Sequence, residues 1–194
     1  MIKIIHRVNK NADLKNISLD MGVEVDIRSK GNELIIHHDP FENGEKFEDW
    51  LIHYNHKFLI LNVKEEGLEK TLISLMKKND IKEYFFLDQS FPFLLKFSKD
   101  CEGRSAVRFS EYESINSVLN LSNVCNWVWV DCFSRNPLTK DNFIKIKKNN
   151  FDICIVSPEL QGRNSIKEIL ELKESLKDKM IFPDAVCTKH PHLW

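Results

Sequence analysis

The stretch from Ile4 to Asp39 combines three short apolar runs with polar side chains that interrupt or close them. The runs are Ile4-Ile5-His6-Arg7, Val23-Glu24-Val25-Asp26-Ile27 and Leu34-Ile35-Ile36-His37-His38-Asp39. β-Branched residues dominate each run, and such residues are typical of strands. We therefore predict three strands, the second and third joined as a hairpin, with reactive groups gathered at the strand ends.

Two carboxylates lie close together on the second of these strands. Glu24 and Asp26 are two residues apart, so they point to one face while the apolar residues of the run point to the other. Carboxylates this close repel each other, and one would keep its proton unless a cation stabilised both charges. Because carboxylate oxygens suit a hard cation, the spacing predicts a divalent metal ion here.

Six further apolar runs follow, each of a length typical of a strand. They are 58–63, 84–87, 105–109, 127–130, 153–156 and 185–187. Together with the first two strands they make eight. Segments with helical spacing lie between them, at 68–78, 92–98, 110–121, 140–148 and 165–176.

This alternation of strands and helices indicates parallel pairing through helical crossovers. Eight such units most naturally close into a TIM-type barrel, whose active site lies at the C-terminal ends of its strands. We therefore predict an α/β fold, a compact TIM-type (β/α)8 barrel with shortened helices and loops. A doubly wound open sheet is the competing architecture, but no glycine-rich phosphate loop follows the first strand.

Composition narrows the class of protein. A chain of 194 residues that is 42% apolar supports one core, so we expect a single domain over 1–194. The formal charge of -1 argues against nucleic-acid binding. Five cysteines without a Cys-x-x-Cys pair indicate reduced thiols rather than disulfides or a thiolate zinc site. Without a signal peptide or an apolar stretch of transmembrane length, we expect a cytoplasmic protein with no membrane insertion.

The order of the motifs resembles the glycerophosphodiester phosphodiesterase family. The signature of that family is His-Arg after the first strand, Glu-x-Asp on the second, and His-Asp after the following hairpin. The resemblance implies that His6 and His38 are the general acid/base pair. It also implies that Glu24 and Asp26 are metal ligands.

Two further segments extend the resemblance. Arg7 and Lys64 would be phosphate contacts, and Lys64 closes Leu61-Asn62-Val63-Lys64, which is similar to a family strand that reads apolar-Glu-apolar-Lys. The segment 185–191 is similar to the family's last strand and its Thr-Asp-x-Pro ending. The resemblance therefore spans nearly the whole chain, although its specific motifs lie before residue 65.

Three positions depart from the family pattern. Asn62 stands where the family has a third carboxylate ligand, but an amide oxygen can still bind Mg²⁺ or Ca²⁺, so the expected metal ligands are Glu24, Asp26 and Asn62. Val8 replaces a glycine and adds a Cβ where backbone and substrate approach each other. Lys189 replaces the aspartate of the last strand's ending.

The expected function is metal-dependent hydrolysis of a small-molecule, glycerophosphodiester-like substrate to an alcohol and a phosphomonoester such as glycerol 3-phosphate. One histidine would activate the attacking oxygen and the other would protonate the leaving oxygen. Attack by a neighbouring hydroxyl and attack by water both remain open, as does the oligomeric state. Two alternatives are a phosphoester-binding barrel with weak or lost catalysis and a metal-dependent sugar isomerase.

The sequence also predicts the positions of several other polar and aromatic side chains. Alternation along the third strand turns His37 away from His38, so we interpret it as structural. His53 and His56 are expected on the surface, and the two tryptophans at 127 and 129 in the core. A group of polar residues at predicted strand ends should include a substrate contact: Asp88, Asp131, Arg135 and Arg163.

Overall fold

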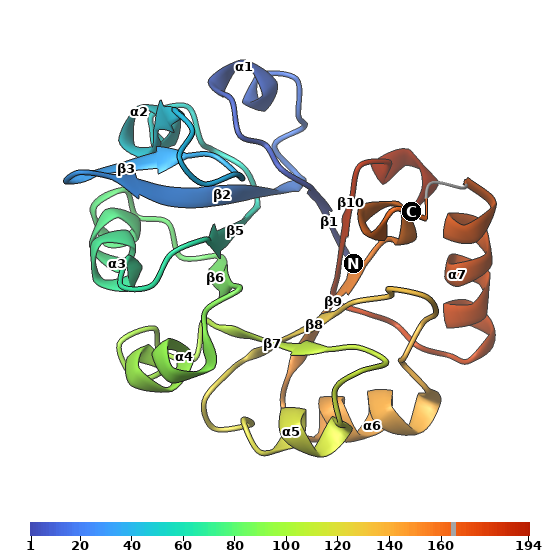
Figure 1. Cartoon of the computed structure of the whole chain (residues 1–194). Helices are drawn as coiled ribbons and strands as arrows, with labels where there is room; N and C mark the ends of the chain where they lie inside the picture. Colours follow the sequence, from blue (N-terminus) through green and yellow to red (C-terminus); the bar gives the residue numbers. More distant parts are fainter. Residues whose placement is uncertain (164–165) are drawn as a thin grey trace. The chain divides into compact units, whose positions relative to one another are not determined.

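The computed structural model describes residues 1–163 and 166–194. These residues divide into two compact units. The first unit contains residues 1–5 and 106–194, and the second contains residues 6–105. Each unit is built on its own run of parallel strands covered by helices (Figure 1).

The second unit contains five strands. β2 (Gly22–Lys30), β5 (Phe58–Val63) and β6 (Tyr84–Leu87) pair in parallel, in that order. The C-terminal half of β2 also forms an antiparallel hairpin with β3 (Glu33–Ile36), which pairs with the two-residue β4 (Glu45–Lys46). The helices of this unit are α1 (Asn11–Leu14), α2 (Phe47–Leu51), α3 (Glu69–Lys78) and α4 (Phe91–Phe97).

The core of the second unit forms around β5, all six residues of which are buried. A strand buried on both faces reads as a continuous apolar run, which explains why residues 58–63 lack the alternation of a surface strand. Four aromatic side chains with at most 1% exposure fill the space beside it: Phe47, Trp50, Phe85 and Phe86. This packing fixes the strand that ends just before Lys64.

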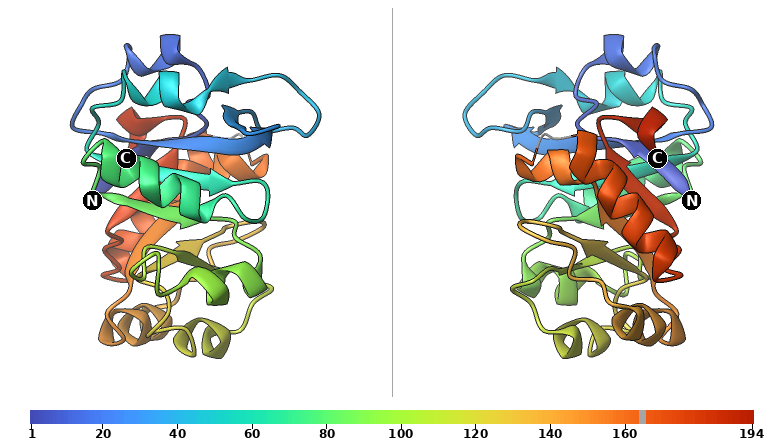
Figure 2. Two further views of the ribbon diagram at one scale, coloured as in Figure 1. Left: turned by 90° about the vertical axis from the view of Figure 1, so that its left-hand side faces the viewer. Right: turned by 90° about the vertical axis from the view of Figure 1, so that its right-hand side faces the viewer.

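The first unit is a sheet of five parallel strands. Its order is β1 (Ile2–Ile5), β10 (Ala185–Thr188), β9 (Asp152–Val156), β8 (Trp127–Val130) and β7 (Ala106–Phe109). The helices between them are α5 (Ile115–Leu119), α6 (Lys140–Lys148) and α7 (Ile166–Asp178), with short 3-10 turns η1 (Pro158–Gln161) and η2 (Pro191–Leu193). Figure 2 shows both chain ends close together within this unit.

The predicted strands are confirmed, because all eight apolar runs form strands that pair in parallel with a neighbour. The predicted helices at 68–78, 92–98 and 140–148 agree within one residue at each end. For the helix expected over 165–176, Ser165 lies outside the described residues and the helix runs from Ile166 to Asp178. The expectation that residues 1–194 form a single domain stays a prediction.

The helix expected over 110–121 is wrong in length, because it forms only from Ile115 to Leu119. The Ser110 hydroxyl accepts a hydrogen bond from the Tyr112 N–H, which holds the first residues in a turn. Ser114 then caps the helix by accepting from the Asn116 N–H. Serine side chains compete with helical backbone bonds in this way, so the helix starts five residues late.

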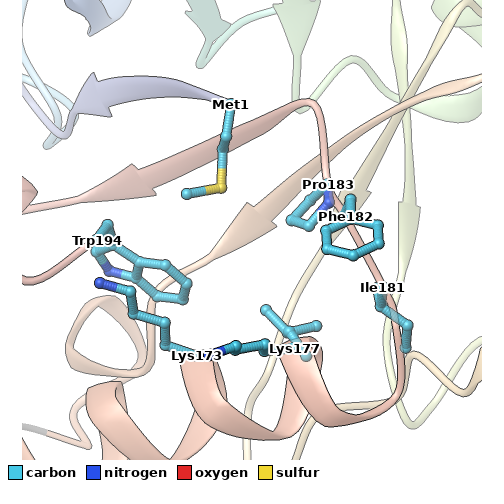
Figure 3. A pocket seen from close by; sticks show the side chains of 8 residues that line it. Met1, Lys173, Lys177, Ile181, Phe182, Pro183 and Trp194 are labelled. Carbon is cyan, nitrogen blue, oxygen red and sulfur yellow. The ribbon is translucent and has the colours of Figure 1, made fainter.

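Buried side chains in the first unit agree with the sequence. Trp127 and Trp129 are buried, as predicted. All five cysteines are buried, and none of them forms a disulfide in the described part of the chain. An apolar hollow of about 260 Å³ lies in this unit. Figure 3 shows side chains that line it, among them Met1, Phe182, Pro183 and Trp194. Because Met1 and Pro183 precede β1 and β10, this hollow lies at the N-terminal ends of the strands, a region associated with stability in barrel folds.

In the described part of the chain, no helix combines the length and the apolar character needed to cross a lipid bilayer.

Candidate functional site

The predicted acidic pair lies in the buried, parallel part of β2. Glu24 and Asp26 have exposed fractions of 0% and 1%. Asp26 is the register partner of Asn62 on the neighbouring strand β5. Strand alternation therefore directs both carboxylates to one face, and parallel register brings the amide of Asn62 beside them. All the residues of this site belong to the second unit.

Both oxygens of Glu24 accept hydrogen bonds. Asn62 Nδ2 donates to Oε1 at 2.8 Å, and the backbone N–H of Arg7 donates to Oε2 at 2.6 Å. His6 Nε2 lies 3.8 Å from the same Oε2 atom. Glu24 therefore joins the segment after β1 to the end of β5.

Asp26 is held by cationic and amide groups. Lys64 Nζ lies 3.2 Å from Oδ1, and Arg7 Nε lies 3.5 Å from Oδ2. Asn9 Nδ2 donates to Oδ2 at 2.8 Å, and the Asp26 N–H donates to Asn9 Oδ1 at 3.1 Å. A buried carboxylate needs such partners, because an unpaired charge in the interior is costly. Protein cations therefore offset part of the negative charge.

Lys64 also contacts a second carboxylate, since its Nζ lies 3.3 Å from Asp88 Oδ2. Asp88 follows β6 and has a φ of 61°, and Arg7 has a φ of 57°. Positive φ is unfavourable for residues other than glycine, and such strain tends to persist at functional sites. The two strained residues therefore flank the acidic pair on two different strand ends.

The segment after β1 is fixed by the core. The Val8 N–H donates to the Glu24 carbonyl at 2.8 Å, and Trp50 Nε1 donates to the Val8 carbonyl at 3.1 Å. The Val8 side chain is 2% exposed. The Cβ that replaces the family's glycine is thus buried in the core, and the expectation that it meets substrate is wrong.

His38 follows β3 and is held by different groups. Its Nδ1 lies 2.8 Å from Asp39 Oδ1, and its carbonyl accepts from Arg28 Nε and Nη2 at 3.1 and 2.9 Å. The hydrogen bond with His38 lowers the pKa of Asp39. The imidazole is therefore oriented by a neighbouring carboxylate, and the backbone beneath it by a guanidinium.

A hollow of about 520 Å³ opens beside these groups, and we call it the His38 hollow. Arg7, His37, His38 and Asp39 line it, together with Lys10 and Glu45. That His37 faces away from His38 and is structural stays a prediction. β3 ends at Ile36, so the alternation of a strand does not continue into the two histidines.

The charge of the acidic pair remains only partly offset. Burial and the nearby charge of Asp26 raise the pKa of Glu24 to about 7. The hydrogen bonds from Asn62 and the Arg7 N–H, with the charge of Lys64, oppose this rise. A further positive charge at this position would favour the ionised form of Glu24.

The side chains present suit a hard cation, although with few ligands. In residues 1–163 and 166–194, no group of three or more His, Cys, Asp or Glu side chains is arranged to hold a metal ion. The predicted set instead combines two carboxylates with Asn62, whose buried Oδ1 has no hydrogen-bond partner among those residues. An amide oxygen and two carboxylates are the donors that Mg²⁺ and Ca²⁺ prefer. The donor set therefore fits such an ion.

The structure brings together most of the residues singled out in the sequence. His6, Arg7 and Lys64 contact the acidic pair, as does Asn62. His38 is held by Asp39 and shares the His38 hollow with Arg7. That the imidazoles of His6 and His38 face each other stays a prediction.

Sequence reasoning missed Asn9 entirely and gave Asp88 only a general role. Asn9 lies in a polar loop, and nothing in its neighbours marks it as the partner of a residue seventeen positions later. The position of Asp88 could be recognised from the sequence, because Asp88 directly follows a predicted strand. His56, expected on the surface, is buried at 8% exposure, with Nε2 lying 3.3 Å from the Ile17 carbonyl.

Comparison with known proteins gives a result at the level of the fold. No family model matches the sequence, and no curated protein matches it. A solved glycerophosphodiester phosphodiesterase from Agrobacterium tumefaciens strain C58 matches 100% of this chain and 97% of its own, with a TM-score of 0.68 and 11% identity. A glycerophosphoryl diester phosphodiesterase from Parabacteroides distasonis ATCC 8503 matches 99% of this chain and 84% of its own, with a TM-score of 0.67 and 11% identity. The predicted fold class is thereby confirmed, and the chain has the α/β TIM-type barrel fold of glycerophosphodiester phosphodiesterases.

Proposed function

We propose that this chain hydrolyses a glycerophosphodiester-like substrate to an alcohol and a phosphomonoester such as glycerol 3-phosphate. The observation that carries the proposal is the convergence of His6, Arg7 and Lys64 on the buried pair Glu24 and Asp26. These residue types are the ones that cleavage of a phosphodiester requires, and the chain has the fold of enzymes named for that reaction.

Proton transfer is assigned to the two histidines. Cleavage needs a base to activate the attacking oxygen and an acid to protonate the leaving oxygen. Imidazole suits both steps, because its ordinary pKa lies close to neutral pH. His6 Nε2 lies 3.8 Å from the buried Glu24 carboxylate, and His38 Nδ1 lies 2.8 Å from the exposed Asp39 carboxylate, so each ring has a carboxylate beside it.

Phosphate binding is assigned to Arg7 and Lys64. Negative charge accumulates on the non-bridging oxygens in the transition state, and fixed cations stabilise it. The Arg7 side chain is 44% exposed, contacts Asp26 and lines the His38 hollow. Lys64 is held between Asp26 and Asp88, which limits the motion of its ammonium group.

A divalent cation, Mg²⁺ or Ca²⁺, would be held by Glu24, Asp26 and Asn62, and would supply further positive charge at a phosphoryl oxygen.

Substitution of each histidine tests the proposal. The wild type should release glycerol 3-phosphate from glycerophosphoglycerol in the presence of Mg²⁺ or Ca²⁺, detected with a coupled dehydrogenase assay. His6→Ala and His38→Ala should each lower turnover by about 10²-fold or more while leaving the circular dichroism spectrum unchanged. His53→Ala, an exposed histidine of the same unit, is the matched control. Full activity of either site variant would exclude the proposed roles.

A second candidate function is phosphoester binding without turnover. Asn62 favours it, because its amide donates to Glu24 where a third carboxylate would strengthen cation binding. Calorimetric titration with glycerol 3-phosphate separates the two functions. Binding of glycerol 3-phosphate, without hydrolysis of any glycerophosphodiester in the presence of Mg²⁺ or of Ca²⁺, would support a binding function.

A further inference from the structure

The turn between β6 and α4 is short and strained. β6 ends at Leu87 and Ser90 is the N-cap residue of α4, so Asp88 and Gln89 alone lie between them. Asp88 has a φ of 61°, which is uncommon for a residue other than glycine. Such a conformation persists only where the surrounding structure fixes it. Contacts within the second unit must therefore hold this turn.

The side chain of Gln89 is bonded at both ends of its amide. Its Nε2 donates to Glu69 Oε1 at 3.1 Å, and its Oε1 accepts from Ser105 Oγ at 2.6 Å. Glu69 and Ser105 are both 0% exposed. Glu69 begins α3, and Ser105 is the bridge partner of Phe86 in β6. Gln89 is therefore fixed between the start of α3 and the chain beside β6.

Glu69 is the polar exception among the buried residues of α3. The others are apolar: Leu72, Ile73, Leu75 and Met76. A buried carboxyl is costly unless it is hydrogen-bonded, and Glu69 Oε2 has no hydrogen-bond partner in residues 1–163 and 166–194. An apolar side chain would avoid this cost, but it would offer no acceptor to the Gln89 amide. The carboxyl of Glu69 therefore matters as that acceptor.

The turn that Gln89 fixes leads directly to the candidate site. Asp88 Oδ2 lies 3.3 Å from Lys64 Nζ, and the same Nζ lies 3.2 Å from Asp26 Oδ1. Displacement of Asp88 would remove one of the two carboxylates that hold the Lys64 ammonium group.

We propose that Gln89 is a positioning residue for Lys64. Held by Glu69 and Ser105, Gln89 keeps Asp88 in the conformation in which the Asp88 carboxylate meets the Lys64 ammonium group. The inference rests on the proposed function, because Lys64 is assigned there to phosphate binding. Gln89 itself takes no part in proton transfer.

A double-mutant cycle tests whether Gln89 acts through Asp88. Gln89→Ala should lower kcat/KM for glycerophosphoglycerol by about two- to fivefold, no more than Asp88→Asn, since both weaken a partly exposed ion pair. In the Asp88→Asn background, Gln89→Ala should cause no further loss. An equal loss in both backgrounds is the result expected of general destabilisation, and it would overturn the inference.

Substitutions of Glu69 test its role as acceptor. Glu69→Gln keeps an oxygen that can accept from the Gln89 amide, so it should retain the wild-type kcat/KM. Glu69→Leu has a similar size but no acceptor, so it should reproduce the loss of Gln89→Ala. Equal kcat/KM values for the two Glu69 variants would contradict the inference.

Asn79→Ala is the matched control. It removes a side-chain hydrogen bond at the other end of α3, from Asn79 Nδ2 to the Leu75 carbonyl at 2.9 Å. This change should leave kcat/KM unchanged. A loss as large as that of Gln89→Ala would show that any weakening of α3 lowers activity, and would count against a specific role for Gln89.

A crystal structure of Gln89→Ala gives a test that does not depend on activity. Asp88 Oδ2 should move beyond about 4 Å from Lys64 Nζ, the limit of an ion pair. An unchanged distance would refute the positioning role. If Gln89→Ala does not fold, Ser105→Ala, which removes the other bond of the Gln89 amide, takes its place in each test.

The outcomes separate this inference from the proposed function. Absence of hydrolysis by the folded wild type overturns the proposed function and the positioning role with it. Hydrolysis by the wild type with an unchanged kcat/KM in Gln89→Ala overturns the positioning role alone.

Discussion

Asn9 and Asp26 bind each other through two reciprocal hydrogen bonds, from Asn9 Nδ2 to Asp26 Oδ2 and from the Asp26 N–H to Asn9 Oδ1. The pair joins the loop after β1 to the centre of β2, and it occupies the side of Asp26 that Lys64 does not. This relationship fixes the orientation of the carboxylate. It therefore makes Asn9 a positioning residue for the acidic pair.

Asn9→Ala should lower the free energy of unfolding by about 1–3 kcal/mol, because it leaves the buried N–H of Asp26 without a partner and leaves Oδ2 with only the Arg7 Nε at 3.5 Å. Urea denaturation measures this loss. Asn16→Ala is the matched control, since the Asn16 side chain is exposed and donates to the nearby Ala12 carbonyl at 3.3 Å. Equal stability of the two variants would show that the reciprocal bonds contribute little.

The raised pKa of Glu24 predicts a pH dependence of stability. The folded chain holds a proton on Glu24 up to about pH 7, whereas the unfolded chain releases it near the usual 4.5. Because the folded state binds more protons between these values, the contribution of Glu24 to the free energy of unfolding falls as the pH rises through that range. The stability of the wild type relative to Glu24→Gln should therefore be greater at pH 4.5 than at pH 8, in chelator.

Millimolar Mg²⁺ or Ca²⁺ provides the control for this prediction. A bound cation favours the ionised carboxyl. On adding the cation, the change in the free energy of unfolding between pH 4.5 and pH 8 should therefore become smaller in the wild type and stay the same in Glu24→Gln. A relative stability that does not vary with pH would contradict the assigned burial of the Glu24 charge.

The sequence predicts those parts of this fold that depend on local periodicity. The strand at 58–63 is buried on both faces, so it can be recognised in the sequence as a continuous apolar run. Helix α3 can be recognised because its apolar residues keep helical spacing over ten residues. α1 and β4 contain four and two residues, too few to show a period. Their positions depend on tertiary contacts such as the bond from the Asn11 N–H to Glu45.

The same distinction applies to the candidate site. Alternation along one strand predicts that Glu24 and Asp26 share a face. Parallel register and loop closure cannot be inferred in this way, and they bring Asn62 and Asn9 to the pair. Alternation gives no direction for His37, because β3 ends one residue earlier, at Ile36.

Asn62→Glu should increase the affinity for a divalent cation. A third carboxylate beside Glu24 adds negative charge, and it removes the amide that now donates to Glu24 Oε1. In chelator the variant should be less stable than the wild type, because three buried carboxylates repel one another. The rise in melting temperature on adding Mg²⁺ or Ca²⁺ should exceed that of the wild type. Asn62→Gln, which adds no charge, should not show this increase, and an equal rise in all three proteins would contradict the proposed ligand set.

Lys64 is held between Asp26 and Asp88, and its charge is expected to stabilise the transition state. Lys64→Met should lower kcat/KM for the preferred diester by about 10²-fold, the loss typical of removing one stabilising donor. Asp88→Asn keeps Lys64 but removes one of its partners, which is 30% exposed, so the loss should be about fivefold at most. Lys57→Met, at an exposed lysine just before β5, is the matched control and should be neutral. If Asp88→Asn were as damaging as Lys64→Met, Asp88 would have to contact substrate itself rather than act only by holding Lys64.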